Sequence, residues 1–347
     1  MLLPLVMFAC SPDPSPALLL AVDRDEDGEY RVAPRPIPEL TDAQHMEGAL
    51  GHGYRGGRIA IELFSADMGI RYDEGGRMDL DYDVIDDVAI PMDEDGLVLW
   101  TYYHTLSQVR ADLNGLGVDT EPVWPIDFAY QPAFVGMDFT SGENAAYLGS
   151  GVHLFILLPD ALPAVLPLAA NPGVIRHEFG HALFNVLTAG DAYAQAPYDA
   201  SDDPMVANKV RALNEGFADM IATLTLDDND FFDLSLPSVT TRDVAADAVA
   251  DATMYPENAE AYDPYALGTV YASFAWDLRE LTSADQAVVL VVAAVDAWSA
   301  EAAWDDTDRW AELLLELSVA EDESLKTPLC AAFAARLPEH PTPETCA

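Results

Sequence analysis

One stretch of the sequence constrains the fold more than any other, a helical pattern that runs from Asn171 to Gly190. Asn171 is a preferred residue just before a helix, Pro172 is tolerated in the first turn, and Gly190 is typical of the position past a helix end. Within this pattern His177 and His181 are four residues apart. They therefore lie one above the other on one helix face, where both imidazoles can bind one Zn²⁺ ion.

A second helical pattern, residues 205–226, offers further ligands. A catalytic zinc site needs a third protein ligand and an open fourth position. Glu215 and Asp219 are again four residues apart, so one carboxylate can bind the metal while the other accepts a hydrogen bond from the rear nitrogen of a histidine. Glu178 directly follows His177, where its carboxylate can reach a water molecule on the metal.

Together these motifs resemble those of the gluzincin zinc metallopeptidases, the thermolysin-like and fungalysin-like enzymes. In these enzymes H-E-x-x-H is followed by N-E-x-x-x-D or G-E-x-x-x-D, which residues 177–181 and 214–219 match. The resemblance implies a zincin-type bilobed domain, with the active-site helix in a mixed β N-lobe and a helical C-lobe. The implied roles are zinc binding by His177, His181 and Glu215, general-base catalysis by Glu178, and support of the ligands by Asp219 and Asn214.

The resemblance extends more weakly over residues 95–320. Asn144 and Ala145 match the family's Asn-Ala stretch, which implies that they offer side-chain and main-chain groups to an extended peptide. Arg242 falls where the family has an arginine that holds a substrate carbonyl, with a surface salt bridge as the alternative. The acidic run 227–233 lies where thermolysin-like enzymes keep calcium ligands, so Ca²⁺ is a second candidate cofactor, and a solvated acidic turn is the alternative.

One family feature is missing. The family usually has a C-lobe histidine that stabilises the oxyanion of the tetrahedral intermediate, and the similar segment 263–276 contains no histidine. Tyr265 is nearest to the expected place, and a phenol can donate the same hydrogen bond. Tyr193 and Tyr198 are candidates for the family's other oxyanion donor, with ordinary packing as the alternative for all three tyrosines. The remaining histidines have no metal-ligand spacing and are interpreted as ordinary residues: His45, His52, His104, His153 and His340.

The order of the predicted elements indicates an α+β fold. Residues 18–95 alternate short apolar runs with acidic turns, which predicts strands, and residues 126–135 and 145–158 are also β-like. A helix is predicted over 97–116, with Gly115 as its stop. The chain becomes rich in helical patterns beyond residue 190, over 205–226, 266–281, 284–299 and 308–318.

We expect three parts: a signal and tether over 1–22, a β-rich region over 23–95, and a zincin-like catalytic domain over 96–347. Residues 23–28 begin like a calcium-binding EF-hand loop, but Pro34 occupies the twelfth position, where that loop needs a glutamate. The segment therefore predicts a turn.

The N-terminal segment and the cysteines indicate an exported protein. The apolar residues 1–9 and Cys10 resemble a bacterial lipoprotein signal, in which Cys10 would carry the lipid; no Lys or Arg precedes the run, and a secretory signal or a buried strand are alternatives. Cys330 and Cys346 form an even pair, as expected for a disulfide in an oxidising compartment. The formal net charge of −44 argues against nucleic-acid partners and against docking on anionic lipid through basic residues.

These observations predict an exported zinc metalloendopeptidase that acts on peptides or proteins, with Glu178 activating the attacking water. Membrane contact is expected only through the N-terminal anchor. The missing histidine favours one alternative, a surface-anchored binding protein that keeps the zinc fold without turnover. A third interpretation, a calcium-dependent acidic adhesion module, depends on the aspartate runs alone.

Overall fold

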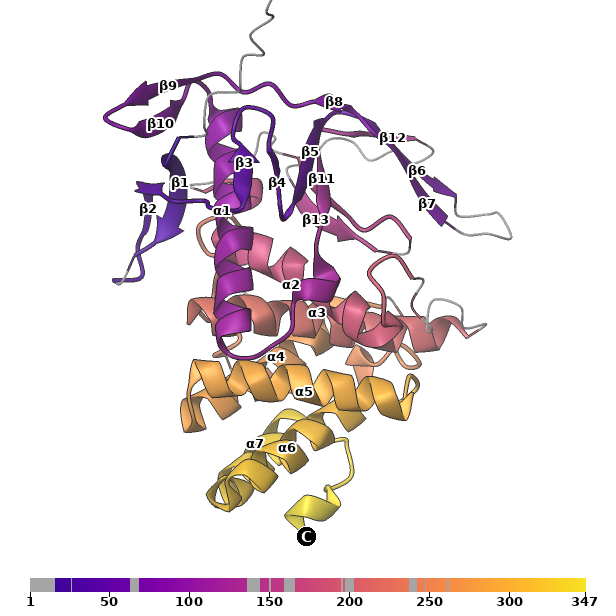
Figure 1. The fold of residues 1–347 in the computed structure, drawn as a ribbon. Coiled ribbons are helices and arrows are strands. Elements are labelled where there is room, and N and C mark those ends of the chain that lie inside the picture. The colour runs from indigo at the N-terminus through magenta and orange to yellow at the C-terminus, as the bar shows by residue number, and fades with distance from the viewer. Residues whose placement is uncertain are drawn as a thin grey trace, which may run out of the picture.

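The computed structural model describes residues 16–347 apart from 26, 63–68, 136–143, 150, 159–165, 195, 197–202, 237–241, 247 and 261. Strands dominate the N-terminal half of the described chain, and helices dominate the C-terminal half (Figure 1). The predicted α+β fold with a β-rich N-terminal part is therefore confirmed. Cys10 and Tyr198 lie outside the described residues.

A four-stranded sheet forms one flank of the molecule. Its order is β2 (Tyr30–Arg35), β1 (Leu18–Arg24), β10 (Val88–Pro91) and β9 (Tyr82–Ile85). β1 and β2 form an antiparallel hairpin, so the segment that begins like an EF-hand loop lies at a hairpin turn, as predicted. The boundary expected between residues 22 and 23 falls inside β1, because the apolar run that starts at Leu18 pairs with both β2 and β10.

A larger sheet crosses the boundary expected between residues 95 and 96. Among the described residues its path is β13 (Asn144–Leu148), β14 (Leu154–Leu158), β11 (Asp127–Tyr130), β5 (Gly51–Arg55), β4 (Glu47–Gly48) and β3 (Leu40–Asp42), and β8 (Gly76–Arg77) pairs with β5. β11 runs parallel to both β5 and β14. The β-rich N-terminal region is thus hydrogen-bonded into the sheet that continues toward the site, and β13 forms one end of that sheet.

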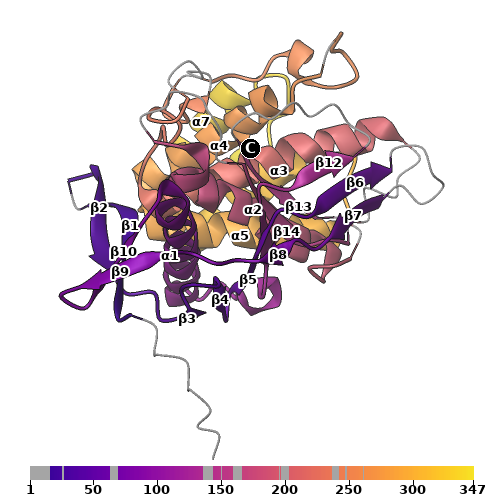
Figure 2. The same cartoon turned by 90° about the horizontal axis from the view of Figure 1, so that it is seen from above.

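Helix α1 (Glu94–Gly115) occupies the middle of the N-terminal half. Seen from above, it lies with the larger sheet between the four-stranded sheet and a small sheet of β12 (Ala133–Val135), β6 (Arg58–Glu62) and β7 (Gly69–Asp73) (Figure 2). Gly115, expected just past the helix end, is instead the last residue of the helix. The left-handed glycine is Gly117, at φ 84°, because the amides of Leu116 and Gly117 still donate to carbonyls of the last turn.

Two helices connect the sheets to the C-terminal part. In α2 (Pro172–Ala189) the Asn171 side chain accepts a hydrogen bond from the Gly173 amide, and Gly190 ends the helix at φ 75°. In α3 (Pro204–Leu226) the Asp203 side chain caps the N-terminus in the same way. The predicted cap and stop residues of α2 are therefore confirmed, and α3 also begins at a capping side chain.

Below α3 lie α4 (Pro264–Leu281), α5 (Ala284–Glu301), α6 (Arg309–Glu321) and α7 (Lys326–Arg336) (Figure 1). The sequence analysis did not predict α7, which includes Cys330. A disulfide joins Cys330 to Cys346 near the C-terminus. Among the described helices, none combines the length and the apolar character that a membrane span requires.

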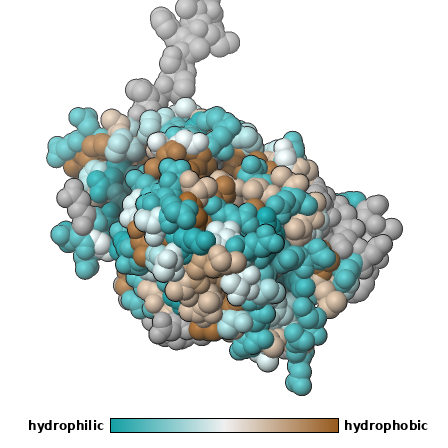
Figure 3. Space-filling model, turned by 90° about the horizontal axis from the view of Figure 1, so that it is seen from below, coloured by the Kyte–Doolittle hydropathy of each residue, from teal (hydrophilic) through white to brown (hydrophobic). Residues whose placement is uncertain are grey.

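The surface reflects the composition. Viewed from the side of the C-terminal helices, it is mostly hydrophilic, with apolar side chains scattered between polar ones (Figure 3). This fits a chain with 60 acidic and 16 basic residues, whose charged side chains favour water.

Candidate metal centre

The site lies where α2 packs against α3, and small residues let the helices approach closely. A Cβ atom added at Gly180 of α2 would lie 2.6 Å from the Cα atom of Ala218 on α3. A Cβ atom added at Gly216 of α3 would lie 2.6 Å from the carbonyl oxygen of Gly268 on α4. Only glycine fits these positions without a backbone shift. The close packing brings residues of three helices within reach of one centre.

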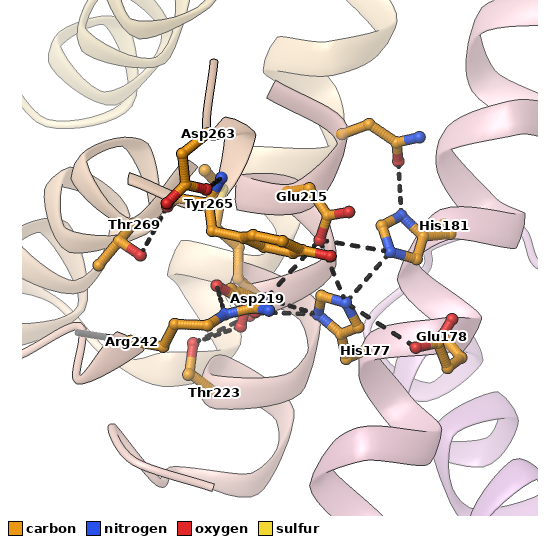
Figure 4. Close-up of polar contacts among 12 residues, drawn as sticks. His177, Glu178, His181, Glu215, Asp219, Thr223, Arg242, Asp263, Tyr265 and Thr269 are labelled. Atoms are coloured by element: carbon orange, nitrogen blue, oxygen red, sulfur yellow. Dashed lines mark hydrogen bonds and ion pairs between the residues drawn. The ribbon is translucent and has the colours of Figure 1, made fainter. Parts of the chain in front are cut away.

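Three side chains from α2 and α3 converge at this centre (Figure 4). The Nε2 atoms of His177 and His181 are 3.1 Å apart, and Oε2 of Glu215 lies 3.5 Å from the first and 3.7 Å from the second. Ligand atoms bound tetrahedrally to zinc at about 2.0–2.1 Å are about 3.4 Å from one another. The observed separations therefore fit one zinc ion between the three atoms.

The chemistry of these atoms also fits a cation. Oε2 of Glu215 is buried without a hydrogen-bond partner, which is costly for a carboxylate unless a cation satisfies it. Within the described part of the chain, this is the one group of three or more His, Cys, Asp or Glu side chains placed to hold a metal ion. The acidic run 227–233 thus forms no such group there, and calcium binding stays a prediction.

The rear nitrogens of both histidines have acceptors. Nδ1 of His177 lies 2.9 Å from Oδ1 of Asp219, and Nδ1 of His181 lies 2.9 Å from Oδ1 of Asn214. Because a carboxylate and an amide oxygen only accept, each Nδ1 carries the proton. In the neutral form of each ring, Nε2 therefore presents its lone pair to the centre, as a metal ligand must.

Charges at the centre keep its carboxylates ionised. Burial raises the pKa of Glu215, but His181 and His177 outweigh it and lower the pKa to about 2. Burial opposes ionisation of Asp219 as well, but Arg242 and His177 lower its pKa. Burial lowers the pKa of His177, and the carboxylates of Asp219 and Glu215 more than compensate, raising it to about 9. Glu215 and Asp219 are thus anionic at neutral pH, and the extra proton that His177 holds would be released when a divalent cation binds.

Glu178 lies beside the three ligands. Its side chain is buried, Oε1 is 4.0 Å from Nε2 of His177, and Oε2 accepts a hydrogen bond of 2.7 Å from the main-chain amide of Tyr147. Burial raises the pKa of Glu178. A carboxylate whose protonated form is favoured by burial is suited to accept a proton and to return it.

Arg242 is buried at the centre rather than exposed in a surface salt bridge. Its guanidinium forms a two-pronged pair with Asp219, at 3.1 Å between Nε and Oδ2 and through Nη2 to Oδ1, and Nη2 lies 3.8 Å from Oε2 of Glu215. The rings of Phe232 and Tyr265 each lie 4.7 Å from the guanidinium carbon. Arg242 thus contacts both Asp219, which supports His177, and the candidate ligand Glu215.

The tyrosine candidates lie in different places. Tyr265, in the first turn of α4, is half-exposed and directs its hydroxyl toward Glu215 (Figure 4). The charge of Glu215, followed by burial, raises the pKa of Tyr265, so the phenol keeps its proton and can donate. Tyr193 is exposed and packs edge-on against the His153 ring, at 5.1 Å between ring centres.

The predicted substrate residues lie on β13. Ala145 is buried and pairs with Leu157 of β14, and Asn144 pairs with Leu158; the Asn144 side chain lies outside the described part. No described strand pairs with the other side of β13.

The sequence analysis assigned no role to two residues: Tyr147, whose amide contacts Glu178, and His153, which contacts Tyr147. His153 was interpreted as an ordinary residue, but it is buried and bonds to the Tyr147 hydroxyl. No sequence spacing signals this contact, which joins the β13–β14 connection to β13 itself.

Comparison of structures, but not of sequences, finds a known protein similar to this chain. No family model matches the chain, and no curated protein matches it. The structure is similar to that of the precursor of protealysin, a metalloproteinase from Serratia proteamaculans, with 11% sequence identity and a TM-score of 0.49. The match covers 81% of this chain and 87% of that chain.

Proposed function

We propose that this protein is a zinc-dependent metalloendopeptidase of the gluzincin type. The observation that carries the proposal is the convergence of His177, His181 and Glu215 within 3.1–3.7 Å of one another, with the Glu178 carboxylate beside them. Three ligands with oriented tautomers leave a fourth position open, which distinguishes a catalytic zinc site from a structural one.

The residues around the centre have complementary roles in hydrolysis. When bound, zinc would polarise the scissile carbonyl and the attacking water as a Lewis acid. Glu178 accepts the proton of the water and returns it to the leaving amine. Tyr265 donates a hydrogen bond to the negative charge that develops on the carbonyl oxygen, in place of the C-lobe histidine that this chain lacks. Asp219 and Asn214 hold the ligand tautomers.

The side of β13 that no described strand covers provides the substrate site in this proposal. An extended peptide would add to the sheet there, with main-chain hydrogen bonds to the strand that includes Ala145 and Tyr147. Because Tyr147 also contacts Glu178, a peptide on this strand lies close to the general base. Recognition through the main chain suits an endopeptidase acting on extended segments of proteins.

Two variants separate the roles of the carboxylates. Glu178→Gln keeps the shape of the side chain but cannot accept the proton, so we expect loss of casein cleavage with about one zinc per chain retained. Glu215→Ala removes a ligand, so zinc itself should be lost. Glu301→Gln, at an exposed position of α5, is the matched control and should change neither. Cleavage by Glu178→Gln at the rate of the parent would contradict the proposal.

A binding protein without turnover is the second candidate, favoured by the missing C-lobe histidine. Retention of zinc without chelator-sensitive cleavage of a broad peptide library would support it. We also propose that the chain is exported, as a cell-envelope lipoprotein anchored through Cys10 or as a secreted protein. The Cys330–Cys346 disulfide supports an oxidising compartment.

A further inference from the structure

A buried histidine lies behind the strand that contacts Glu178. His153 has 1% of its surface exposed and a left-handed backbone with φ 50°. Its Nδ1 atom is 2.8 Å from the Tyr147 hydroxyl, and its Nε2 atom is 2.7 Å from the carbonyl oxygen of Val123. Both ring nitrogens are therefore engaged by partners on different segments.

The partners define the direction of each hydrogen bond. The Val123 carbonyl can only accept, so Nε2 of His153 carries a proton and donates it. Burial lowers the pKa of His153, which favours the neutral ring, and Nδ1 then has a free lone pair. The Tyr147 hydroxyl therefore donates to Nδ1, and the imidazole connects Tyr147 to Val123.

The other end of this connection is fixed to the active-site helix. Val123 is fully buried at the end of the 3₁₀ helix η1 (Glu121–Val123). The next residue, Trp124, stacks on Phe179, with ring centres 5.3 Å apart and planes 22° apart. Phe179 directly follows Glu178 on α2. The contacts thus form a closed path. It runs from Phe179, beside Glu178, through Trp124, Val123, His153 and Tyr147, and it returns to Glu178 through the Tyr147 amide.

The Tyr147 amide selects one orientation of the Glu178 carboxylate. It binds Oε2 at 2.7 Å, which leaves Oε1 facing the metal ligands, 4.0 Å from Nε2 of His177. Without that donor, the carboxylate could rotate about its last bond at little cost. The position of β13 relative to α2 therefore determines where the basic oxygen points.

We propose that His153 and Tyr147 are positioning residues, which hold β13 so that the Tyr147 amide aims the Glu178 carboxylate at the centre. The inference rests on the proposed role of Glu178 as the base. It explains why a histidine is buried in a strained backbone conformation on a strand connection. A general base that is misdirected by a small shift loses much of its effect.

The first test uses the metal-free full chain and requires no activity. In ¹⁵N-tyrosine-labelled protein, the Tyr147 amide is identified by its loss in Tyr147→Phe. Its proton resonance should lie downfield, because a charged acceptor strengthens the hydrogen bond, and should move upfield in Glu178→Gln. We expect a similar upfield shift in His153→Leu and a smaller one in His153→Asn, since asparagine tolerates the left-handed backbone and can still accept from Tyr147. An unmoved resonance in either His153→Leu or Glu178→Gln would overturn the inference.

The second test measures peptide cleavage by the zinc-loaded protein. Tyr147→Phe should lower kcat about tenfold and change KM less than about twofold, because the base is misplaced while the substrate strand remains. Tyr255→Phe is the matched control: it removes a tyrosine hydrogen bond to Asp308, 2.9 Å long, on other elements. It should leave kcat unchanged even if the melting temperature falls.

Two results would overturn the inference. One is an equal kcat for Tyr147→Phe and the parent; the other is a kcat of His153→Asn no higher than that of His153→Leu. A parent without peptidase activity would refute the proposed function, and the resonance test would still decide whether the contact is held as inferred.

Discussion

Replacing Gly180 by alanine tests whether the contact between α2 and α3 sets the geometry of the centre. The added Cβ atom would lie 2.6 Å from the Cα atom of Ala218, 3.2 Å from its Cβ atom and 3.3 Å from its carbonyl oxygen. Carbon atoms pack at about 3.5–4.0 Å, so the helices would have to separate locally by about 1 Å. The nearest atom belongs to the backbone, so a change of rotamer cannot relieve the contact.

Two opposing effects determine how much Gly180→Ala changes the free energy of unfolding. Overpacking of a core costs about 1–3 kcal/mol, while alanine in a helix interior gains about 1 kcal/mol over glycine, so we expect a net loss of stability between about 0 and 2 kcal/mol. A separation of about 1 Å would also move Glu215 away from both histidines. Because disturbing groups that merely orient zinc ligands weakens binding about 10–100-fold, moving a ligand itself should weaken it at least tenfold.

Two quantities are measured for Gly180→Ala and for the parent. Zinc affinity is measured by competition with a chromophoric chelator, and stability by thermal unfolding of the metal-free protein. Gly115→Ala in α1 is the matched control, because no atom lies within 4 Å of the added Cβ. It should leave zinc affinity unchanged and stability equal or higher. If Gly180→Ala binds zinc as tightly as the parent and unfolds at the same temperature, close helix packing does not set the ligand geometry.

Three further predictions concern stability. Burial opposes ionisation of Asp23, but its hydrogen-bonding neighbours lower its pKa from 3.8 to about 2. Asp23→Asn should therefore cost about 2 kcal/mol near pH 7, and the difference from the parent should disappear as the pH falls from about 4 to about 2, as chemical denaturation at several pH values would show. Cys346→Ala opens a loop spanning 16 residues and should lower the unfolding free energy by about 3 kcal/mol without changing zinc affinity. Arg242→Met leaves Asp219 buried without its cation and should cost about 3 kcal/mol, with Arg242→Lys between this variant and the parent in urea unfolding.

The sequence predicted the parts of the fold that depend on neighbouring residues. Asn171, Pro172 and Gly190 mark the ends of α2 because capping involves residues within one turn. His177 and His181 share a face because helix geometry fixes the distance between residues four apart. The disulfide pairing followed from the small number of cysteines.

Contacts between segments that are distant in the sequence could not be predicted as well. The burial of Arg242 depends on α3, α4 and the loop after α3, which together exclude water from its guanidinium. The role inferred for His153 depends on three segments that meet behind β13. In both cases the single-residue signal, an isolated arginine or histidine, is the same as that of a surface residue.

The position of the third ligand, Glu215, depends both on local sequence signals and on the packing of two helices. No periodicity specifies the distance from Glu215 to the histidines, because the helices α2 and α3 could pack at many separations and angles. Two small residues in the sequence nevertheless indicate close packing of the helices: Gly180, between the two histidines, and Ala218, near Glu215. A glycine inside an apolar helix lowers its stability, so its presence there needs a packing reason. That reason is the close approach that lets ligands from two helices reach one ion, and the glycine that weakens α2 alone makes the centre possible.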